Sequence, residues 1–80
     1  MKQTGNERAY EDLAHRRAFG DRVRELRKER GWTQEVLAEA AGMGRGYLAE
    51  IEGGRRAATI DTIHRIAIAL GVTIADLFTS

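Results

Sequence analysis

Four polar side chains in the middle of this sequence have the chemistry to bind phosphate groups and base edges. Arg45 carries a planar guanidinium fork that matches the O6 and N7 atoms of guanine. Arg55 and Arg56 can form charge-assisted hydrogen bonds to phosphate oxygens. Gln34 can donate its side-chain amide to a phosphate oxygen. Whether these groups act together depends on the elements that carry them.

The sequence contains no pattern typical of a catalytic or metal site. It has no carboxylate pair at a useful spacing, and its Gly-rich stretch GMGRG lacks the Lys-Ser/Thr of a phosphate-binding loop. The absence of cysteine excludes disulfides and thiolate metal sites, and fits a cytoplasmic protein. His15 and His64 lie far apart on unrelated patterns. We therefore expect neither an enzyme nor a bound metal or cofactor.

Length and charge restrict the class of protein further. Eighty residues make one domain, of a size at which a single core is only marginally stable, so dimerisation would help. No apolar run approaches a membrane span, and there is no signal-peptide pattern. Residues 1–32 carry nine Lys and Arg against six Asp and Glu, whereas residues 33–80 carry four against six. A basic stretch of this kind is by itself more typical of a solvated helix face.

The segment 33–53 (TQEVLAEAAGMGRGYLAEIEG) organises the rest of the chain. It opens with a short helical pattern in which Leu37 and Ala41 lie four residues apart on one face. Thr33 is a plausible N-cap of this helix, and Gly42 can take the left-handed conformation that ends it. The spacing therefore predicts a first short helix that stops at a tight turn.

A second short helix is predicted immediately after that turn. Leu48 and Ile51 lie three residues apart, and Gly53 and Gly54 stop the pattern. We expect this helix over residues 44–52. Two short helices joined by a Gly-containing turn form a helix-turn-helix, whose second helix can enter a DNA major groove.

Three further helices are expected around this pair. Their apolar residues recur at spacings of three and four. These residues are Phe19, Val23 and Leu26 in the first helix, Ile60, Ile63, Ala67 and Leu70 on the inner face of the fourth, and Ile74, Leu77 and Phe78 in a last short helix.

Residues 19–78 resemble the lambda-repressor/Cro-type (XRE) helix-turn-helix family. The matching pieces are FGDRVRELRKERGWTQEVLAEAAG, YLAEIEGGRR and TIDTIHRIAIALGVTIADLF, about three-quarters of the chain. Within that family the chain is most similar to small stand-alone regulators such as the controller proteins of restriction-modification systems. The resemblance implies an all-α, compact five-helix domain that binds a palindromic operator as a homodimer and regulates transcription. It places the protein in the cytoplasm at the nucleoid, with RNA polymerase as a further candidate partner.

The domain proper is expected over residues 18–80, with residues 1–17 as a polar N-terminal arm. The arm could be partly disordered, or could form a short helix or extend the first helix. Its basic tip, Arg16 and Arg17, could follow the DNA backbone or enter a minor groove.

The resemblance also assigns structural and interface roles. It implies that Arg27 pairs with Glu52, which would tie the first helix to the end of the recognition helix. It implies that the fourth and fifth helices form the dimer interface. An alternative for Leu77 and Phe78 is that they fold back onto their own core. The candidate interface residues are Ile68, Ile74, Leu77 and Phe78.

The residues expected to face DNA gather at the two ends of the helix-turn-helix and along its second helix. They are Thr33, Gln34, Gly44, Arg45, Gly46, Tyr47, Ala49, Glu50, Arg55 and Arg56. Gln34 has simple solvent exposure as its alternative role.

The expected roles within the second helix differ from residue to residue. Arg45 is favoured for a base contact over a phosphate contact alone. Ala49 could touch a thymine methyl, and Glu50 could accept from cytosine N4 or repel phosphate on wrong sequences. Tyr47 could contact a phosphate, stack at a deformable step, or pack against the core.

Family members more often carry Ser, Thr or Asn where this chain has Gly44 and Gly46. Fewer side chains are then left for direct readout, so part of the specificity is expected to come from DNA shape. Rival functions are a module that uses the same fold against a protein partner, such as an antitoxin, and a purely structural bundle. The four polar residues Gln34, Arg45, Arg55 and Arg56 favour DNA over both.

Overall fold

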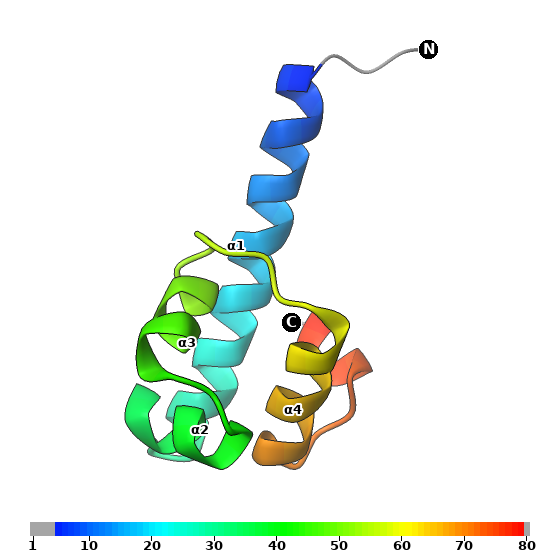
Figure 1. Cartoon of the computed structure of the whole chain (residues 1–80). Helices are drawn as coiled ribbons and strands as arrows, with labels where there is room; N and C mark the ends of the chain where they lie inside the picture. Colours follow the sequence, from blue (N-terminus) through cyan, green and yellow to red (C-terminus); the bar gives the residue numbers. More distant parts are fainter. Residues whose placement is uncertain (1–4, 80) are drawn as a thin grey trace.

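The computed structural model describes residues 5–79, and side chains from residue 13 onward. Figure 1 shows α1 along the middle of the molecule, with α2 and α3 on one side and α4 on the other. The elements in chain order are α1 (Gly5–Glu29), α2 (Gln34–Ala41), α3 (Arg45–Glu52), α4 (Ile60–Leu70) and the 3₁₀-helix η1 (Ala75–Phe78). The described residues contain no strand, in keeping with the all-α class.

The prediction of five helices was wrong in its last element. The described residues form four α-helices, and the fifth expected helix is a single 3₁₀ turn of four residues. Its backbone bonds span three residues, from Asp76 N–H to the Thr73 carbonyl and from Leu77 N–H to the Ile74 carbonyl. Thr73 and Asp76 also cap one another, and the hydrogen bonds from Thr73 lower the pKa of the Asp76 carboxyl.

Local capping chemistry sets the ends of α2 and α4. Thr33 Oγ1 accepts from Val36 N–H at 3.2 Å, and Thr59 Oγ1 accepts from Thr62 N–H at 3.1 Å. Each helix then ends at a glycine with a left-handed backbone, at φ 69° for Gly42 and φ 71° for Gly71. The caps expected at Thr33 and Gly42 are therefore confirmed.

The core lies where α1, α2, α3, α4 and η1 meet. Its fully buried side chains are Val23, Leu37, Leu48, Ile51, Ile66 and Leu77. Placing Ile60 on the inner face of α4 was wrong, because its side chain is 77% exposed whereas Ile66 is fully buried. The buried residues of α4 are Thr62, Ile66, Ala67 and Leu70, and Ile60 precedes them on the first turn of the helix.

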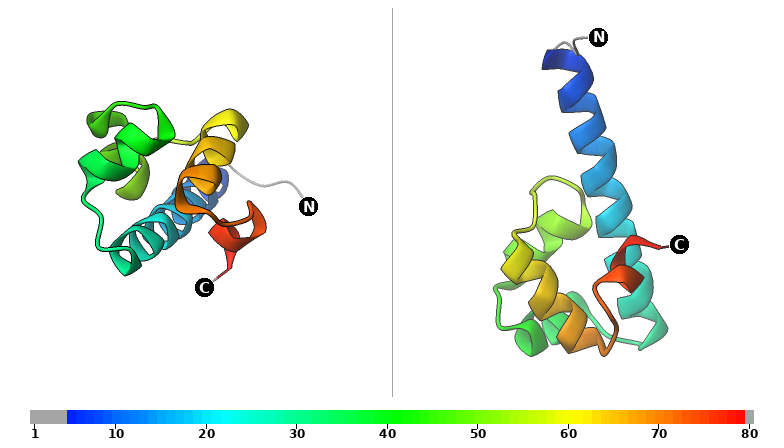
Figure 2. Two further views of the ribbon diagram at one scale, coloured as in Figure 1. Left: turned by 90° about the horizontal axis from the view of Figure 1, so that it is seen from below. Right: turned by 90° about the vertical axis from the view of Figure 1, so that its right-hand side faces the viewer.

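α1 is a single helix that continues well past the rest of the domain at its N-terminal end. Figure 1 and the right-hand view of Figure 2 show its first turns standing clear of the other elements. Residues 5–17 are thus part of the same helix as residues 18–29. The first part of the expected arm, residues 1–4, lies outside the described residues.

A close crossing joins α1 to the end of α3 at Gly20. A Cβ added at Gly20 would lie 2.5 Å from the Glu52 carbonyl oxygen and would also meet the Ile51 carbonyl oxygen. These obstacles are backbone atoms, so a side chain at this position could be accommodated only if the helices moved apart. Gly20 therefore sets the distance between α1 and α3, a role that we did not predict from the sequence.

A buried ion pair joins the same two helices at Arg27, seven residues or about two turns further along α1. Arg27 Nε donates to Glu52 Oε2 at 2.8 Å and Arg27 Nη2 donates to Glu52 Oε1 at 3.0 Å, with the two side chains 9% and 2% exposed. Arg27 Nη1 also donates to the Trp32 carbonyl at 2.7 Å, and Gln34 Nε2 donates to Glu52 Oε1 at 3.1 Å. The bidentate pair thus has further partners on both sides, which a buried charge requires.

Replacing Gly20 by Ala should destabilise the fold, because the added methyl group would press on the α3 backbone. We expect the free energy of unfolding, measured by urea denaturation, to fall by about 1–3 kcal/mol. Gly46→Ala is the matched control, because a Cβ there meets nothing within 4 Å and the change should stabilise α3 by roughly 0.5–1 kcal/mol. A Gly20→Ala protein as stable as the wild type would refute the close crossing.

Glu52→Gln should be costly, because it leaves the buried Arg27 charge without a carboxylate. The expected loss is about 3–5 kcal/mol by the same measurement. Glu50→Gln removes one partner of the exposed Arg56–Glu50 pair and should cost less than about 1 kcal/mol. Equal costs for the two substitutions would contradict a stabilising role of the buried pair.

Candidate nucleic-acid interface

α3 has one face fixed in the domain and the opposite face in solvent. Leu48, Ile51 and Glu52 are buried against the rest of the domain. Arg45 and Gly46, in the first turn, are exposed. Since the buried face anchors the helix, the exposed face has a defined orientation and is available to a partner.

The first turn of α3 is built from glycine and arginine. Gly44 is the N-cap, with an extended backbone (φ −72°, ψ 147°) and no side chain to cap the helix. Arg45 follows, and within the described part of the chain its guanidinium pairs with no carboxylate. Neither Gly44 nor Gly46 would place a Cβ against anything within 4 Å. This end of α3 therefore presents little side-chain bulk, and its one positive charge has no carboxylate partner among the described residues.

Glu50, Arg56 and Tyr47 interact at the middle and end of α3. Arg56 Nε donates to Glu50 Oε1 at 2.9 Å, and the Arg56 guanidinium carbon lies 5.5 Å from the centre of the Tyr47 ring. The Tyr47 hydroxyl is 3.2 Å from Thr62 Oγ1 on α4, and the residue packs against the core. Tyr47 therefore connects α3 to α4, while Arg56 is already paired with an acidic group. Ala49, half-buried, lies beside this group on α3.

Gln34, at the start of α2, points one of its N–H groups inward. That group donates to Glu52, and the residue is half-buried. A glutamine amide has two N–H donors, so one remains for an outside acceptor. Thr33, next to it, is exposed and uses its hydroxyl as the helix cap.

The loop after α3 carries the remaining basic residues. Gly54 is buried and has a left-handed backbone (φ 74°), and a Cβ there would lie 2.6 Å from Arg17 Cγ. Arg55 is exposed, with its guanidinium carbon 3.7 Å from where a Cβ on Gly53 would be, so its side chain runs back along the end of α3. The sequence pattern predicts Gly53 and Gly54 only as a helix stop. We did not predict from it that the close approach of Arg17 also requires glycine at position 54.

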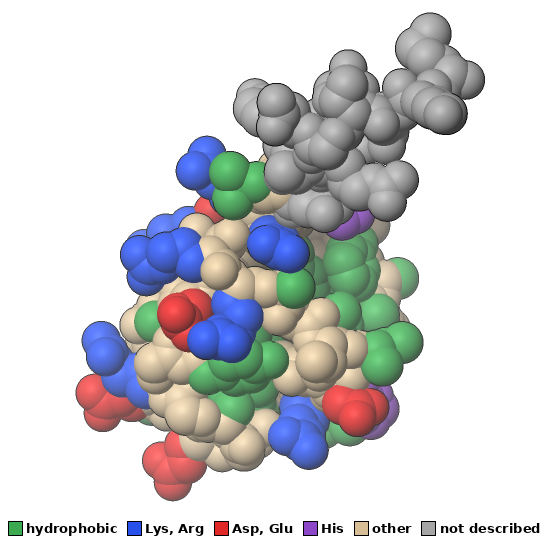
Figure 3. All heavy atoms as spheres, turned by 45° about the horizontal axis from the view of Figure 1, so that its top comes forward, with side chains coloured by type: hydrophobic (Ala, Val, Ile, Leu, Met, Phe, Trp, Pro, Cys, Tyr) green, Lys and Arg blue, Asp and Glu red, His purple; other side chains and the backbone are tan. Residues whose placement is uncertain are grey.

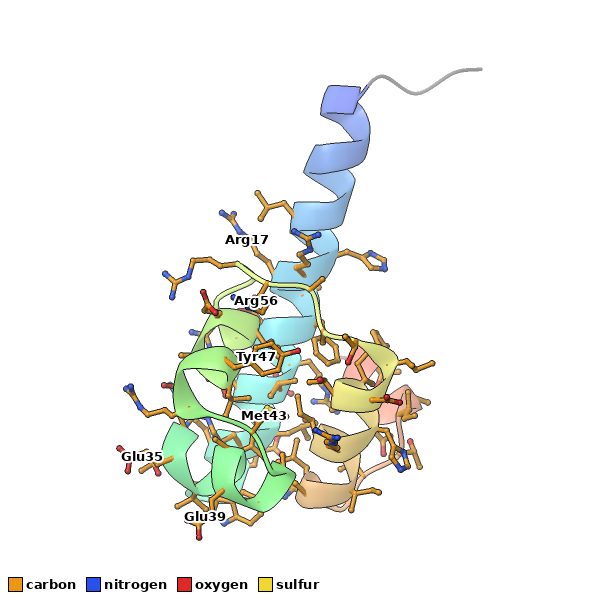
Figure 4. All side chains as sticks on the ribbon, in the orientation of Figure 1. Arg17, Glu35, Glu39, Met43, Tyr47 and Arg56 are labelled. Carbon is orange, nitrogen blue, oxygen red and sulfur yellow. The ribbon has the colours of Figure 1, made fainter. Side chains whose placement is uncertain are left out.

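Basic and apolar side chains are unevenly distributed over the face drawn in Figure 3. Figure 3 shows Lys and Arg gathered mainly on the side where α3 lies, and hydrophobic side chains mainly on the side of α4. In Figure 4, Tyr47 points from α3 toward α4, and Glu35 and Glu39 point outward from α2. The basic surface thus follows α3 and the loop after it.

The candidate interface residues do not all lie at the surface. Ile68, Ile74 and Phe78 are 65%, 42% and 56% exposed. Placing Leu77 in a dimer interface was wrong, because its side chain is fully buried in the core of its own chain. Phe78 also packs on its own chain, with its ring centre 5.2 Å from that of Phe19.

No helix among residues 5–79 is long and apolar enough to cross a membrane.

Known proteins share this architecture. The sequence matches the helix-turn-helix family HTH_3 over residues 23–77. It is 39% identical to the HTH-type transcriptional regulator y4dJ of Sinorhizobium fredii over 64 residues, which are 80% of this chain and 83% of that protein. It is 40% identical to the control protein C.BamHI of Bacillus amyloliquefaciens over 60 residues, 74% of each chain.

A solved structure extends the similarity to three dimensions. The restriction-modification controller protein C.AhdI from Aeromonas hydrophila superposes with a TM-score of 0.80 at 38% identity, over 81% of this chain and 98% of that one. The resemblance drawn from the sequence is thereby confirmed. This protein is a transcriptional regulator with a DNA-binding helix-turn-helix, and it belongs to the XRE-type helix-turn-helix family HTH_3.

Proposed function

We propose that this protein is a sequence-specific regulator that binds a palindromic operator as a homodimer, with α3 in the major groove. The observation that carries the proposal is the exposed, unpaired Arg45 at the start of a helix whose other face is locked to α1 by the Arg27–Glu52 pair. A guanidinium held in a defined place can donate two hydrogen bonds to guanine O6 and N7.

The other polar groups have supporting roles in this proposal. Arg55 and Arg56 bind phosphates at the end of α3, and the free N–H of Gln34 binds a phosphate beside the Thr33 cap at the start of α2. Glu50 and Ala49 lie further along α3 and read or reject the bases that they face.

The proposed fit of α3 in the groove depends on its small residues. Gly44 and Gly46 let the helix approach the bases closely without reading them. Tyr47 holds α3 on α4 and forms the edge of the surface. Since few side chains reach the bases, DNA shape supplies part of the specificity.

The proposed dimer uses the surface opposite the basic one. Ile68, Ile74 and Phe78 are exposed apolar side chains on α4, on the turn before η1 and on η1. Burying them between two copies would form a two-fold dimer, and dimers of this class read half-sites about one helical turn of DNA apart. Such a regulator acts at the nucleoid in the cytoplasm, within reach of RNA polymerase.

Arg45→Ala should reduce the preference for the selected DNA sequence more than it reduces the affinity for DNA in general. We would select a site from random duplexes and compare its affinity with that of random-sequence duplex across a salt series. The wild type should prefer the selected site by a factor on the order of a thousand or more. Arg45→Ala should lose about 1–3 kcal/mol of that preference for each guanine read. A variant equally weakened on both duplexes would show that Arg45 binds phosphate only, and a wild type that binds neither would refute the proposed function.

Ile68→Glu should give monomers with little operator affinity, because a carboxylate would be buried in the interface. Sedimentation equilibrium measures the oligomeric state. Ile60→Glu is the matched control, since Ile60 is an exposed isoleucine on the same helix and eight residues, about 12 Å, from Ile68. If Ile68→Glu remains dimeric, the interface lies elsewhere.

A further inference from the structure

The N-terminal half of α1 brings a further arginine to the basic surface. Arg17 lies where α1 passes the loop after α3 (Figure 4). The helix-turn-helix match begins only at residue 23, so it does not include Arg17.

The position of Arg17 is set by close backbone contact. A Cβ on Gly54 would lie 3.0 Å from Arg17 Cα and 3.1 Å from Arg17 N, so the loop rests directly on the helix backbone. Gly54 immediately precedes Arg55 in the chain. The backbones that carry Arg17 and Arg55 are therefore held together, although the two residues are far apart in sequence.

The charge of Arg17 has no acidic partner among the described side chains. On a helix, carboxylates three or four residues away are the ones in reach. Those positions are Leu13, Ala14, Gly20 and Asp21, and the Asp21 carboxylate pairs with Arg24. The Arg17 side chain is exposed. It is thus a positioned cation that no carboxylate among the described side chains neutralises.

Arg17 faces the same side of the molecule as the residues that follow α3. Figure 4 shows Arg17 and Arg56 together beside the end of α3, one carried by α1 and the other by the loop. Figure 3 shows the basic side chains gathered on this side. An anion bound by Arg55 would therefore lie beside α1 as well.

We propose that Arg17 and Arg55 together bind the DNA backbone, so that the DNA-contacting surface extends from the helix-turn-helix onto α1. This inference rests on the proposed function. An α-helix is about 10 Å or more across and the minor groove only about 6 Å wide, so this part of α1 lies along the backbone and does not enter that groove. Contacts to phosphate carry no sequence information, so Arg17 contributes affinity and not discrimination.

Arg17→Ala tests this assignment, because it removes the cation while keeping a residue that favours helix. We expect affinity for a selected duplex and for a random-sequence duplex to fall by a similar factor, roughly tenfold at low salt. The slope of log K against log salt should become shallower by about 0.9 for each protomer bound, roughly two for a dimer. Arg17→Lys should keep most of the affinity, since an ammonium group also binds phosphate.

Arg65→Ala is the matched control for the loss of one positive charge. Arg65 is exposed on α4, which lies on the other side of α1 from α3 (Figure 1). Its removal should leave the salt slope at the wild-type value. Circular dichroism and sedimentation on each variant show whether the protein is still folded and dimeric. Arg17→Gln is a second variant, which removes the charge but keeps the apolar stem of the side chain.

Two results would overturn the inference. The first is a folded, dimeric Arg17→Ala or Arg17→Gln protein whose salt slope equals that of Arg65→Ala. The second is a loss of affinity confined to the selected duplex, which would mean that Arg17 reads sequence. Both leave DNA binding by the wild type intact. A wild type without salt-dependent binding to either duplex would instead refute the proposed function itself.

Discussion

The arrangement of the DNA-binding helix depends on one buried ion pair. The side chains of Arg27 and Glu52 are almost completely buried. Each buried charge is stabilised by the bidentate pair that it forms with the other. The Trp32 carbonyl and the Gln34 amide complete the set of hydrogen bonds, so the pair joins α1, the turn after α1, α2 and the end of α3. Any rotation of α3 that moved Glu52 would leave a buried charge unpaired. The direction in which Arg45 points, seven residues earlier, is therefore determined at the far end of its own helix.

Two glycines allow α1 to pack closely against the end of α3 and against the loop that follows it. At Gly20 the backbone of α3 lies where a Cβ would be, and at Gly54 the backbone of the loop lies against Arg17. The helix thus lies so close to the end of α3 and to the segment that follows it that a Cβ on either glycine would meet backbone atoms. Because these contacts are between backbones, they position the loop without depending on flexible side chains. The same contacts bring a residue from outside the helix-turn-helix next to the basic loop.

The side-chain interactions on the exposed face of α3 are weaker than those on its buried face. Arg56 is shared between the Glu50 carboxylate and the Tyr47 ring, and both members of the ion pair are about half exposed. An exposed pair of this kind contributes only about 0–1 kcal/mol. Arg56 can therefore leave Glu50 for a phosphate at small cost, whereas Arg27 cannot leave Glu52. Rigid anchoring on one side and weak, exchangeable pairing on the other suit a surface that must adapt to a charged partner.

The sequence by itself determined α2, α3 and α4 and the ends of α2 and α4, because helix spacing and caps depend on residues within one turn of each other. Thr33, Thr59, Gly42 and Gly71 lie at the boundaries for which their local chemistry predicts them. The buried pair was inferred only from resemblance. Tertiary structure alone decided that Leu77 lies in the core, that Ile60 lies in solvent and that the last helix is a short 3₁₀ turn. It also decided the roles of Gly20 and Gly54, since a close approach between backbones distant in sequence has no local signal.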